Sequence, residues 1–310
     1  MLLEIRGVSN IMKTQYFAIS LDPIHIGAGG YRLGMVDNTI VREPSTDVPK
    51  IPGTSLAGAI REYAKINIME SELCGKEKTQ KEREECAEEK IREYFGHENR
   101  QGVFRFYDGQ IIFFPIPSTY GTIWVTTKSL LLYWMCTENK KEQQRLAQIE
   151  IKDKAYFIKR NEKKTNKVDF GWVCLEADFD FCENDYLSLP TIEGTNLLNN
   201  IAIVSDKLFT HLVNDNLEVR TSVRIDSETG AAVEGALFTY EAIPRATLFG
   251  FEIIQKSGVD KITGNKLLQG TFPLLELLGV GGMGTRGFGR IKVFDNESTN
   301  AMTNGGEANG

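Results

Sequence analysis

The segment from Gln15 to Arg61 constrains the fold of this chain most strongly, because it reads as a strand, a glycine-rich loop and a helix in succession. Gln15 to Leu21 is rich in the apolar and aromatic residues of strands. After Lys50, apolar residues recur at helical spacing, and Thr54 or Ser55 is a natural N-cap. A long glycine-rich loop that leads to a helix N-terminus is suited to binding a phosphate, although this signal alone is weak.

The rest of the chain alternates strands with helices and contains no repeated βαβ unit, which indicates an α+β fold. Ferredoxin-like modules fit this order. Asp108-Gly109 predicts a tight hairpin between two strands. We expect one domain over residues 1–295, with an irregular leader at 1–14, a charged helical insertion at 71–100, a flexible basic loop at 138–168 and a disordered tail at 296–310. The remaining predicted strands are 121–126, 201–204, 246–255 and 288–294, and the remaining helices are 127–136, a short helix after Ser205 and 261–278.

Residues 217–241 predict a long β-hairpin. Along the first strand, Val219 and Val223 alternate with Arg220 and Arg224, so that one face is apolar and the other carries arginines. The turn Asp226–Gly230 then reverses the chain.

The bulk composition is that of an ordinary globular protein. The chain has 310 residues, 41% of them hydrophobic, and a net charge of −6, which is the wrong sign for a typical nucleic-acid binder. Five cysteines without paired short spacing predict reduced thiols and, with no apolar signal segment, a cytoplasmic protein. The longest apolar run, Leu130–Cys136, is too short to cross a membrane.

A second glycine-rich segment, Gly279–Arg290, contains G-x-G-x-x-G in two registers. A dinucleotide site would need a strand before this segment and a helix after it, whereas the sequence predicts the reverse order. The dinucleotide interpretation therefore fails. What remains is a loop of exposed backbone with Arg286 and Arg290, suited to packing against a phosphodiester chain or needing its glycines only for tight turns.

Few residues of the chain suit catalysis by side chains alone. No H-E-x-x-H, G-x-S-x-G or metal-ligand cluster is present, and three histidines supply a Ser-His-Asp mechanism poorly. His25 and Asp37 share the first glycine-rich loop. Asp in such a loop is more often a turn residue than a catalyst.

Several of these segments together resemble the N-terminal signature of RAMP proteins, the RNA-binding subunits of CRISPR effector complexes, and most closely the backbone subunit of the type III-B (Cmr) complex. The likeness spans most of residues 15–294, although the C-terminal loop is closer to the wider superfamily. The segments that carry it are Asp22–Gly27, Gly34–Glu43, Pro49–Leu56, Phe114–Thr122, Val223–Asp226 with Thr229-Gly230, Glu234–Phe238 and the C-terminal glycine-rich loop.

The resemblance implies a ferredoxin-like, RRM-like core with helical insertions, and subunits that stack head-to-tail along a guide RNA. The hairpin at 217–241 resembles the family's thumb, which interrupts the guide–target duplex at regular intervals. The implied partners are guide crRNA, complementary target RNA, copies of the same chain and other type III CRISPR subunits, with no membrane. The candidate RNA-binding residues are Lys50, Ser55, Arg61, Arg220, Arg224, Arg286 and Arg290.

The resemblance also implies a metal-dependent endoribonuclease. In the family an Asp of the first long loop is required for cutting the target, and its motif falls on Asp37. We expect Asp37 to position a divalent ion, Mg²⁺ or Mn²⁺, because an unperturbed carboxylate with a pKa near 4 is a poor base at neutral pH. His25, Asp108 and Glu234 are weaker catalytic candidates.

Two alternatives remain open at this point. The chain could be a RAMP subunit that only binds guide RNA, with Asp37 structural. It could also be a metabolic enzyme with a glycine-rich cofactor loop, because fold and loop alone do not fix function.

Overall fold

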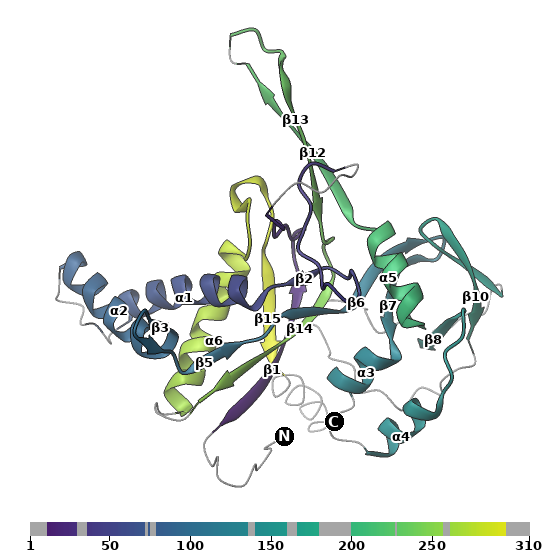
Figure 1. Cartoon of the computed structure of the whole chain (residues 1–310), viewed down its shortest axis with the longest axis horizontal. Coiled ribbons are helices and arrows are strands. Elements are labelled where there is room, and N and C mark those ends of the chain that lie inside the picture. Colours follow the sequence, from purple (N-terminus) through teal and green to yellow (C-terminus); the bar gives the residue numbers. More distant parts are fainter. Residues whose placement is uncertain are drawn as a thin grey trace, which may run out of the picture.

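The computed structural model describes residues 11–29, 36–71, 74, 79–135, 140–159, 166–179, 200–226, 228–256 and 261–295. Within them, the chain forms one large mixed sheet of eleven strands, with six helices and a hairpin that extends away from the sheet (Figure 1). This arrangement confirms the prediction of a mixed fold built from interleaved strands and helices.

The elements have the following bounds. The strands of the large sheet are β1 (Met12–Ser20), β2 (Lys50–Ile51), β5 (Phe104–Phe106), β6 (Gly109–Ser118), β7 (Gly121–Thr127), β8 (Ala155–Lys159), β9 (Lys167–Phe170), β10 (Val173–Asp178), β11 (Ile201–Val204), β14 (Leu248–Gln255) and β15 (Ile291–Asp295). The helices are α1 (Gly53–Glu70), α2 (Gln80–Phe95), α3 (Lys128–Trp134), α4 (Lys140–Gln148), α5 (Asp206–Asp215) and α6 (Lys261–Leu278), with a 3-10 turn at Gly284–Arg286. Two further antiparallel pairs are β3 (Gly96–His97) with β4 (Arg100–Gln101), and β12 (Glu218–Ile225) with β13 (Ala232–Ala242).

The strands of the large sheet run in the order β15-β1-β14-β6-β7-β11-β8-β10-β9, with β2 beside β6 and β5 beside β14. β1 lies between β14 and β15 and is antiparallel to both. Successive side chains of a strand point to opposite faces, so β1 serves two cores. Tyr16 and Ala18 pack with residues of α1 and α6, whereas Phe17 and Ile19 pack with Trp134 of α3.

Helix α1 is fixed to the sheet by its apolar stripe and at its N-terminus. Leu56 and Ile60 are fully buried, and each such side chain contributes about 2 kcal/mol through burial. The predicted N-cap at Thr54 or Ser55 is wrong, because the helix begins at Gly53 with Pro52 at the cap position. Asp108 Oδ1 accepts the Gly53 N–H at 2.7 Å instead, so that a distant carboxylate replaces the local cap.

The hairpin predicted at Asp108-Gly109 is also wrong. β5 and β6 pair with β14 and not with each other, and β2 occupies the place beside Gly109. Asp108 does not form the predicted turn because its carboxylate binds the Gly53 N–H at the start of α1 and lies 2.7 Å from Lys50 Nζ. In the segment 138–168, where we predicted a loop, the chain forms α4 and β8 before residues 160–165, which lie outside the described residues.

The prediction that all cysteines are reduced is wrong for one pair. Cys74, which follows α1, forms a disulfide with Cys86 of α2, with their Cα atoms 5.9 Å apart. The two residues are separated by 12 positions, a spacing with no recognised motif, so only the packing of α1 against α2 brings them together. Cys174 is a free thiol.

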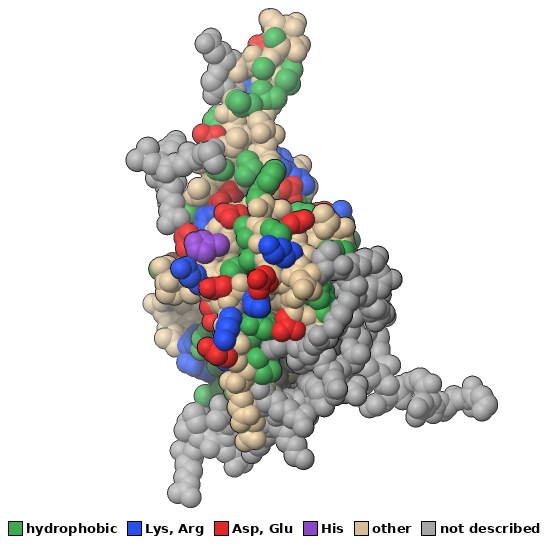
Figure 2. Space-filling view, turned by 90° about the vertical axis from the view of Figure 1, so that its right-hand side faces the viewer, with side chains coloured by type: hydrophobic (Ala, Val, Ile, Leu, Met, Phe, Trp, Pro, Cys, Tyr) green, Lys and Arg blue, Asp and Glu red, His purple; other side chains and the backbone are tan. Residues whose placement is uncertain are grey.

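The predicted hairpin forms as β12–β13, with Glu218 opposite Ala242 and Val223 opposite Leu237, and a register shift before Ile225. It projects beyond the rest of the chain (Figure 1), and hydrophobic side chains gather along it (Figure 2). The exposed large apolar residues on it are Val219, Val223, Ile225, Leu237 and Phe238.

Some predictions concern the ends of the chain. β1 begins at Met12, so the predicted leader is too long by three residues, and residues 1–10 and the predicted tail at 296–310 lie outside the described residues. In the part of the chain that the structure describes, no helix is long and apolar enough to span a membrane.

Candidate nucleic-acid interface at the base of the hairpin

The opening loop runs alongside β13 where the hairpin leaves the body of the protein. Asn38 N–H donates to Thr239 O at 3.0 Å, and Glu241 N–H donates back to Asn38 O at 3.0 Å. The loop therefore adds a short parallel segment to the base of the hairpin. This pairing fixes the residue just before Asn38, which is Asp37.

Asp37 is exposed, and one of its carboxylate oxygens is anchored. Oδ2 accepts both the backbone N–H and the hydroxyl of Thr239 at 2.8 Å each, and Asp37 N–H donates to the same hydroxyl oxygen at 2.9 Å. These bonds, that from the backbone N–H above all, lower the pKa of Asp37 below its ordinary value. Oδ1 has no hydrogen-bond partner among the described residues, so an ionised oxygen faces outward.

His25 lies inward of Asp37 and is 6% exposed. Its Nδ1 is 2.7 Å from Glu241 O. A carbonyl oxygen only accepts, so Nδ1 carries a proton and donates it to Glu241 O. The ring also contacts Tyr240 and Phe288 edge-on. His25 therefore joins the opening loop, the hairpin and the C-terminal loop.

The C-terminal glycine-rich loop packs against the same region. Gly281 has φ of 87°, and a Cβ there would lie 2.7 Å from His25 O, so only glycine fits. Gly282 N–H donates to His25 O at 3.1 Å. Gly281 and Gly282 of the predicted loop therefore pack closely against the opening loop, and Gly284 and Gly287 are exposed.

Three of the predicted RNA-binding arginines meet at this loop. Arg286 donates to the Tyr240 hydroxyl at 2.9 Å, and the Arg220 guanidinium lies 4.8 Å from the centre of the Phe288 ring. Arg290 pairs with Asp22, a hydrogen bond that holds the pKa of Asp22 below its ordinary value. These contacts orient the arginines and leave Arg286 exposed.

Two of the other predicted RNA-binding residues, Lys50 and Arg61, are held in ion pairs. Lys50 is paired with Glu43 at 2.8 Å and with Asp108 at 2.7 Å. Arg61 is paired with Glu88 of α2 at 3.0 Å, and Ser55 is half-buried in the first turn of α1. Their roles in RNA binding and that of Asp108 in catalysis stay predictions.

Two further predicted residues lie higher on the hairpin. Arg224 is exposed and has no ion pair among the described residues. Glu234 belongs to β13, and its side chain lies outside what the structure describes.

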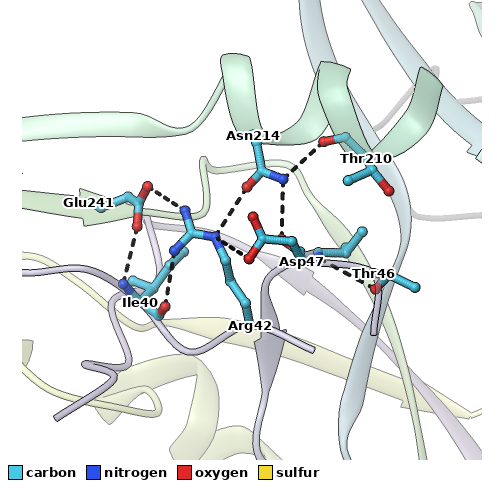
Figure 3. A network of polar contacts seen from close by, with 8 residues as sticks. Ile40, Arg42, Thr46, Asp47, Thr210, Asn214 and Glu241 are labelled. Atoms are coloured by element: carbon cyan, nitrogen blue, oxygen red, sulfur yellow. Dashed lines mark hydrogen bonds and ion pairs between the residues drawn. The ribbon is translucent and has the colours of Figure 1, made fainter. Parts of the chain in front are cut away.

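A network of polar contacts that the sequence did not predict lies behind the opening loop (Figure 3). Arg42 Nη2 contacts Glu241 Oε1 at 2.5 Å, and the side chains are 11% and 12% exposed. Glu241 Oε2 accepts the Ile40 N–H at 3.2 Å, and Arg42 Nε donates to Asn214 Oδ1 of α5 at 3.2 Å. No motif in the sequence marks these residues as partners of one another, because Arg42 and Glu241 are about 200 positions apart.

A divalent ion at this site would need ligands from the bound RNA in addition to those from the protein. Among the described residues, no three His, Cys, Asp or Glu side chains converge as metal ligands. Mg²⁺ is commonly held by one or two carboxylates together with substrate phosphates. The outward oxygen of Asp37 fits that second arrangement and does not fit an all-protein cage.

Comparison with known proteins agrees with the sequence signature. A match to the RAMP superfamily covers residues 19–292. This chain belongs to the RAMP superfamily. The CRISPR system Cmr endoribonuclease Cmr4 of Pyrococcus furiosus is 30% identical over 304 residues, which cover 93% of this chain and 96% of that protein. The predicted likeness to the type III-B (Cmr) backbone subunit is therefore confirmed.

Solved structures share the fold of this RAMP chain. The type III-B Cmr-beta complex bound to cognate target RNA contains a chain with a TM-score of 0.68 and 17% identity, covering 93% of this chain and 98% of that one. Oligomeric Cmr4 from Pyrococcus furiosus has a TM-score of 0.57 and 22% identity, with 92% and 98% covered. At these identities the likeness is one of fold.

Proposed function

We propose that this protein is the RNA-cleaving backbone subunit of a type III-B CRISPR effector complex. It binds guide RNA, stacks with copies of itself and cuts complementary target RNA at regular intervals. The observation that carries the proposal is the exposed, ionised carboxylate of Asp37, held at the base of a projecting hairpin. The family membership and the 30% identity to an endoribonuclease support it.

The proposed core is ferredoxin-like. β1, α1 and β6 form its first half, and β14, α6 and β15 form the second. The strand order β15-β1-β14-β6, antiparallel throughout, supports this assignment. The hairpin is then an insertion between the second and third core strands. It rises from the part of the core where the opening loop and the glycine-rich loop meet.

The hairpin acts as the thumb. An apolar ribbon that projects from a protein cannot be buried against its own core, and apolar side chains of such ribbons can part stacked bases. Val223 and Leu237 face each other across the hairpin and are 42% and 61% exposed. Parting the stack frees the RNA backbone at the hairpin base to turn.

The proposed reaction is attack by a ribose 2′-oxygen on the adjacent phosphorus. The new P–O2′ bond forms as the P–O5′ bond breaks, which leaves a 2′,3′-cyclic phosphate and a 5′-hydroxyl. The proton leaves the 2′-oxygen, and the departing 5′-oxygen gains one. In-line geometry supplies much of the acceleration, because the bound RNA is already turned toward the line of attack.

Asp37 provides a fixed negative charge beside the scissile phosphate. With its pKa lowered, it stays ionised at neutral pH and is a poor proton acceptor, so its role is to hold a cation. Mg²⁺ or Mn²⁺ bound there would neutralise charge on the phosphate and the departing oxygen. Thr239 keeps the carboxylate in place, and His25 supports the loop from beneath.

The proposed partners are guide crRNA, complementary target RNA, copies of the same chain and other subunits of the complex. Arg286, Arg220 and Arg290 contact RNA backbone at the hairpin base, which suits an acidic chain with one local basic surface. Head-to-tail contacts between copies generate an open helical assembly rather than a closed ring. Cleavage would then recur once per subunit.

The proposal is tested by reconstituting the complex with Asp37→Asn. The expected result is target binding without the ladder of cleavage products, and loss of the wild-type ladder when Mg²⁺ is chelated. Asp153→Asn, an exposed carboxylate between α4 and β8, is the matched control and should cleave normally. An Asp37→Asn complex that still produces a regular ladder with cyclic phosphate ends would refute the catalytic assignment.

One observation favours a second candidate. The bonds from Thr239 to Asp37 are also those of a structural carboxylate that ties the loop to the hairpin. A RAMP subunit that binds guide RNA without cutting would need Asp37 only for that tie. In that case Asp37→Asn would impair assembly or guide binding, and the wild-type complex would bind target RNA without cleaving it.

A further inference from the structure

The opening loop is held in place by more than its pairing with β13. Arg42, five residues after Asp37, reaches three parts of the chain at once (Figure 3). Its Nη2 contacts Glu241 of β13 at 2.5 Å, its Nε donates to Asn214 of α5 at 3.2 Å, and its Nη1 donates to Ile40 O at 3.2 Å. The guanidinium therefore joins loop, hairpin and helix.

Glu241 transmits this contact toward Asp37. Its second carboxylate oxygen accepts the Ile40 N–H, its backbone N–H donates to Asn38 O, and its carbonyl accepts from His25. Glu241 thus holds Asn38 and Ile40, which follow Asp37 by one and three residues, and also binds the His25 ring. The side chain keeps this arrangement only while its charge is balanced, and Arg42 is its ion-pair partner.

Removing Arg42 would leave a nearly buried carboxylate without a counter-charge. Such a group either takes up a proton or turns toward solvent, because an unpaired buried charge is strongly unfavourable. In both cases the bond from Ile40 N–H weakens, and the loop loses its anchor three residues from Asp37. A lysine keeps the charge but lacks the planar fork that serves several acceptors at once.

Arg42 is poorly placed to bind RNA itself. Its side chain is 11% exposed, and each of its three nitrogens already has an acceptor within the subunit. Asp47, whose carboxylate lies 3.9 Å from Nε, and Asn214, which donates to Asp47 O at 3.1 Å, close the network on the side of α5. Phosphate binding would have to break these contacts.

We infer that Arg42 is a positioning residue for RNA cleavage, which acts through Glu241 to hold the Asp37 segment against the hairpin. This inference rests on the proposed function. If Arg42 acts by positioning, its loss should slow cleavage while the affinity for target RNA stays the same. If Arg42 contacted RNA directly, its loss should lower both.

The experiment compares reconstituted complexes that carry wild-type protein, Arg42→Met, Arg42→Lys, Asp37→Asn or Lys13→Met. The last is the matched control: Lys13 pairs at 2.6 Å with Glu252, a carboxylate that is 11% exposed and lies on β14, away from the loop. For each complex, single-turnover cleavage, target affinity and amide exchange of the peptide covering residues 37–42 are measured.

The expected result for Arg42→Met is cleavage slower by about tenfold to a hundredfold, target affinity close to wild type, and faster exchange in the peptide 37–42. Arg42→Lys should fall between Arg42→Met and wild type, and Lys13→Met should match wild type in all three measurements. If Arg42→Met does not assemble, the Arg42→Lys complex provides the test. Slower cleavage with normal target binding by Arg42→Lys supports the inference, and cleavage at the wild-type rate overturns it.

Three other outcomes would overturn the inference. They are wild-type cleavage by an assembled Arg42→Met complex, an equal loss of cleavage and target affinity, and an equal effect of Lys13→Met. The proposed function fails separately, if Asp37→Asn cleaves at the wild-type rate. An inactive Asp37→Asn together with a fully active Arg42→Met would leave the proposed function standing and remove this inference alone.

Discussion

Asp108 offers a sharp test of how this fold is held together, because its two carboxylate oxygens serve different partners. Oδ1 accepts the N–H of Gly53, the first residue of α1, and Oδ2 contacts Lys50 Nζ at 2.7 Å. Asp108→Asn should keep the acceptor for Gly53 and lose the ion pair. Asp108→Ala should lose both.

The magnitude follows from these two contacts. Loss of a helix N-cap costs about 1 kcal/mol. The ion pair contributes up to about 1 kcal/mol, since the Asp108 side chain is 42% exposed and Lys50 keeps a second partner in Glu43. Asp108→Ala should therefore lower the free energy of unfolding by about 2 kcal/mol, or about 3 °C in midpoint for a chain of this size. Asp108→Asn should lose about half of that.

The pH dependence gives an independent check. Burial alone would raise the pKa of Asp108, but the hydrogen bonds from Lys50 and the Gly53 N–H outweigh it and lower the pKa. A carboxyl group whose pKa is lower in the folded state stabilises the fold above its unfolded pKa, about 3.9, and this contribution disappears as the pH falls through the folded value. The gap between wild type and Asp108→Ala should thus be full at pH 7 and shrink below about pH 4.

The assay is denaturant unfolding of the isolated subunit, followed by far-ultraviolet circular dichroism across this pH range. Equal stabilities of Asp108→Ala and wild type at pH 7 would refute the capping role. Equal losses in the alanine and asparagine variants would show that only the charge matters. A tenfold loss of cleavage by an assembled Asp108→Asn complex would support the supporting catalytic role that the resemblance implies for this carboxylate.

Three further predictions concern other parts of the chain. Reduction of the Cys74–Cys86 disulfide, which closes a loop of about 12 residues, should lower the free energy of unfolding by about 3 kcal/mol; urea unfolding with and without dithiothreitol checks this, and a Cys74→Ser/Cys86→Ser variant should not respond to the reductant. Because the pKa of Asp37 is lowered, its ionisation should not make single-turnover cleavage decline between pH 7 and pH 5; a decline there that Asp37→Glu shifts would contradict this. Arg224→Ala should weaken guide RNA binding and reduce the slope of log affinity against log salt by about 0.7 to 0.9, whereas Arg61→Ala should change it less, since Arg61 is already paired with Glu88; titrations at several salt concentrations compare the two.

The sequence predicted those elements whose signals are local and repeated. The alternation in β12, the apolar spacing in α1, and the helices predicted after Ser205 and at 261–278 all appear in the structure. Where the prediction failed, a contact between distant residues had overridden a local preference. Asp108-Gly109 is a good hairpin turn, yet Asp108 instead caps a helix that begins 55 residues earlier.

The candidate site divides in the same way. Asp37 and His25 could be named from their motif, as could the arginines of the glycine-rich loop. Thr239, Glu241 and Arg42 could not, because their importance arises only when the loop lies along β13, about 200 residues away in sequence. Thr and Glu at the end of an alternating strand carry no signal of such a partner. Pairing across that separation is a property of the folded chain.

The hydrogen bonds between Asp37 of the opening loop and Thr239 of β13 connect the two parts of the proposed function. β13 carries Leu237 and Phe238, which lie exposed on the hairpin, and one or two residues later Thr239, which binds the Asp37 carboxylate. The side chains proposed to part the RNA stack and the residue that holds the Asp37 carboxylate therefore lie on the same strand of the hairpin. The position of the cut is then set by where each subunit sits on the guide, and the sequence of the target enters only through its pairing with the guide.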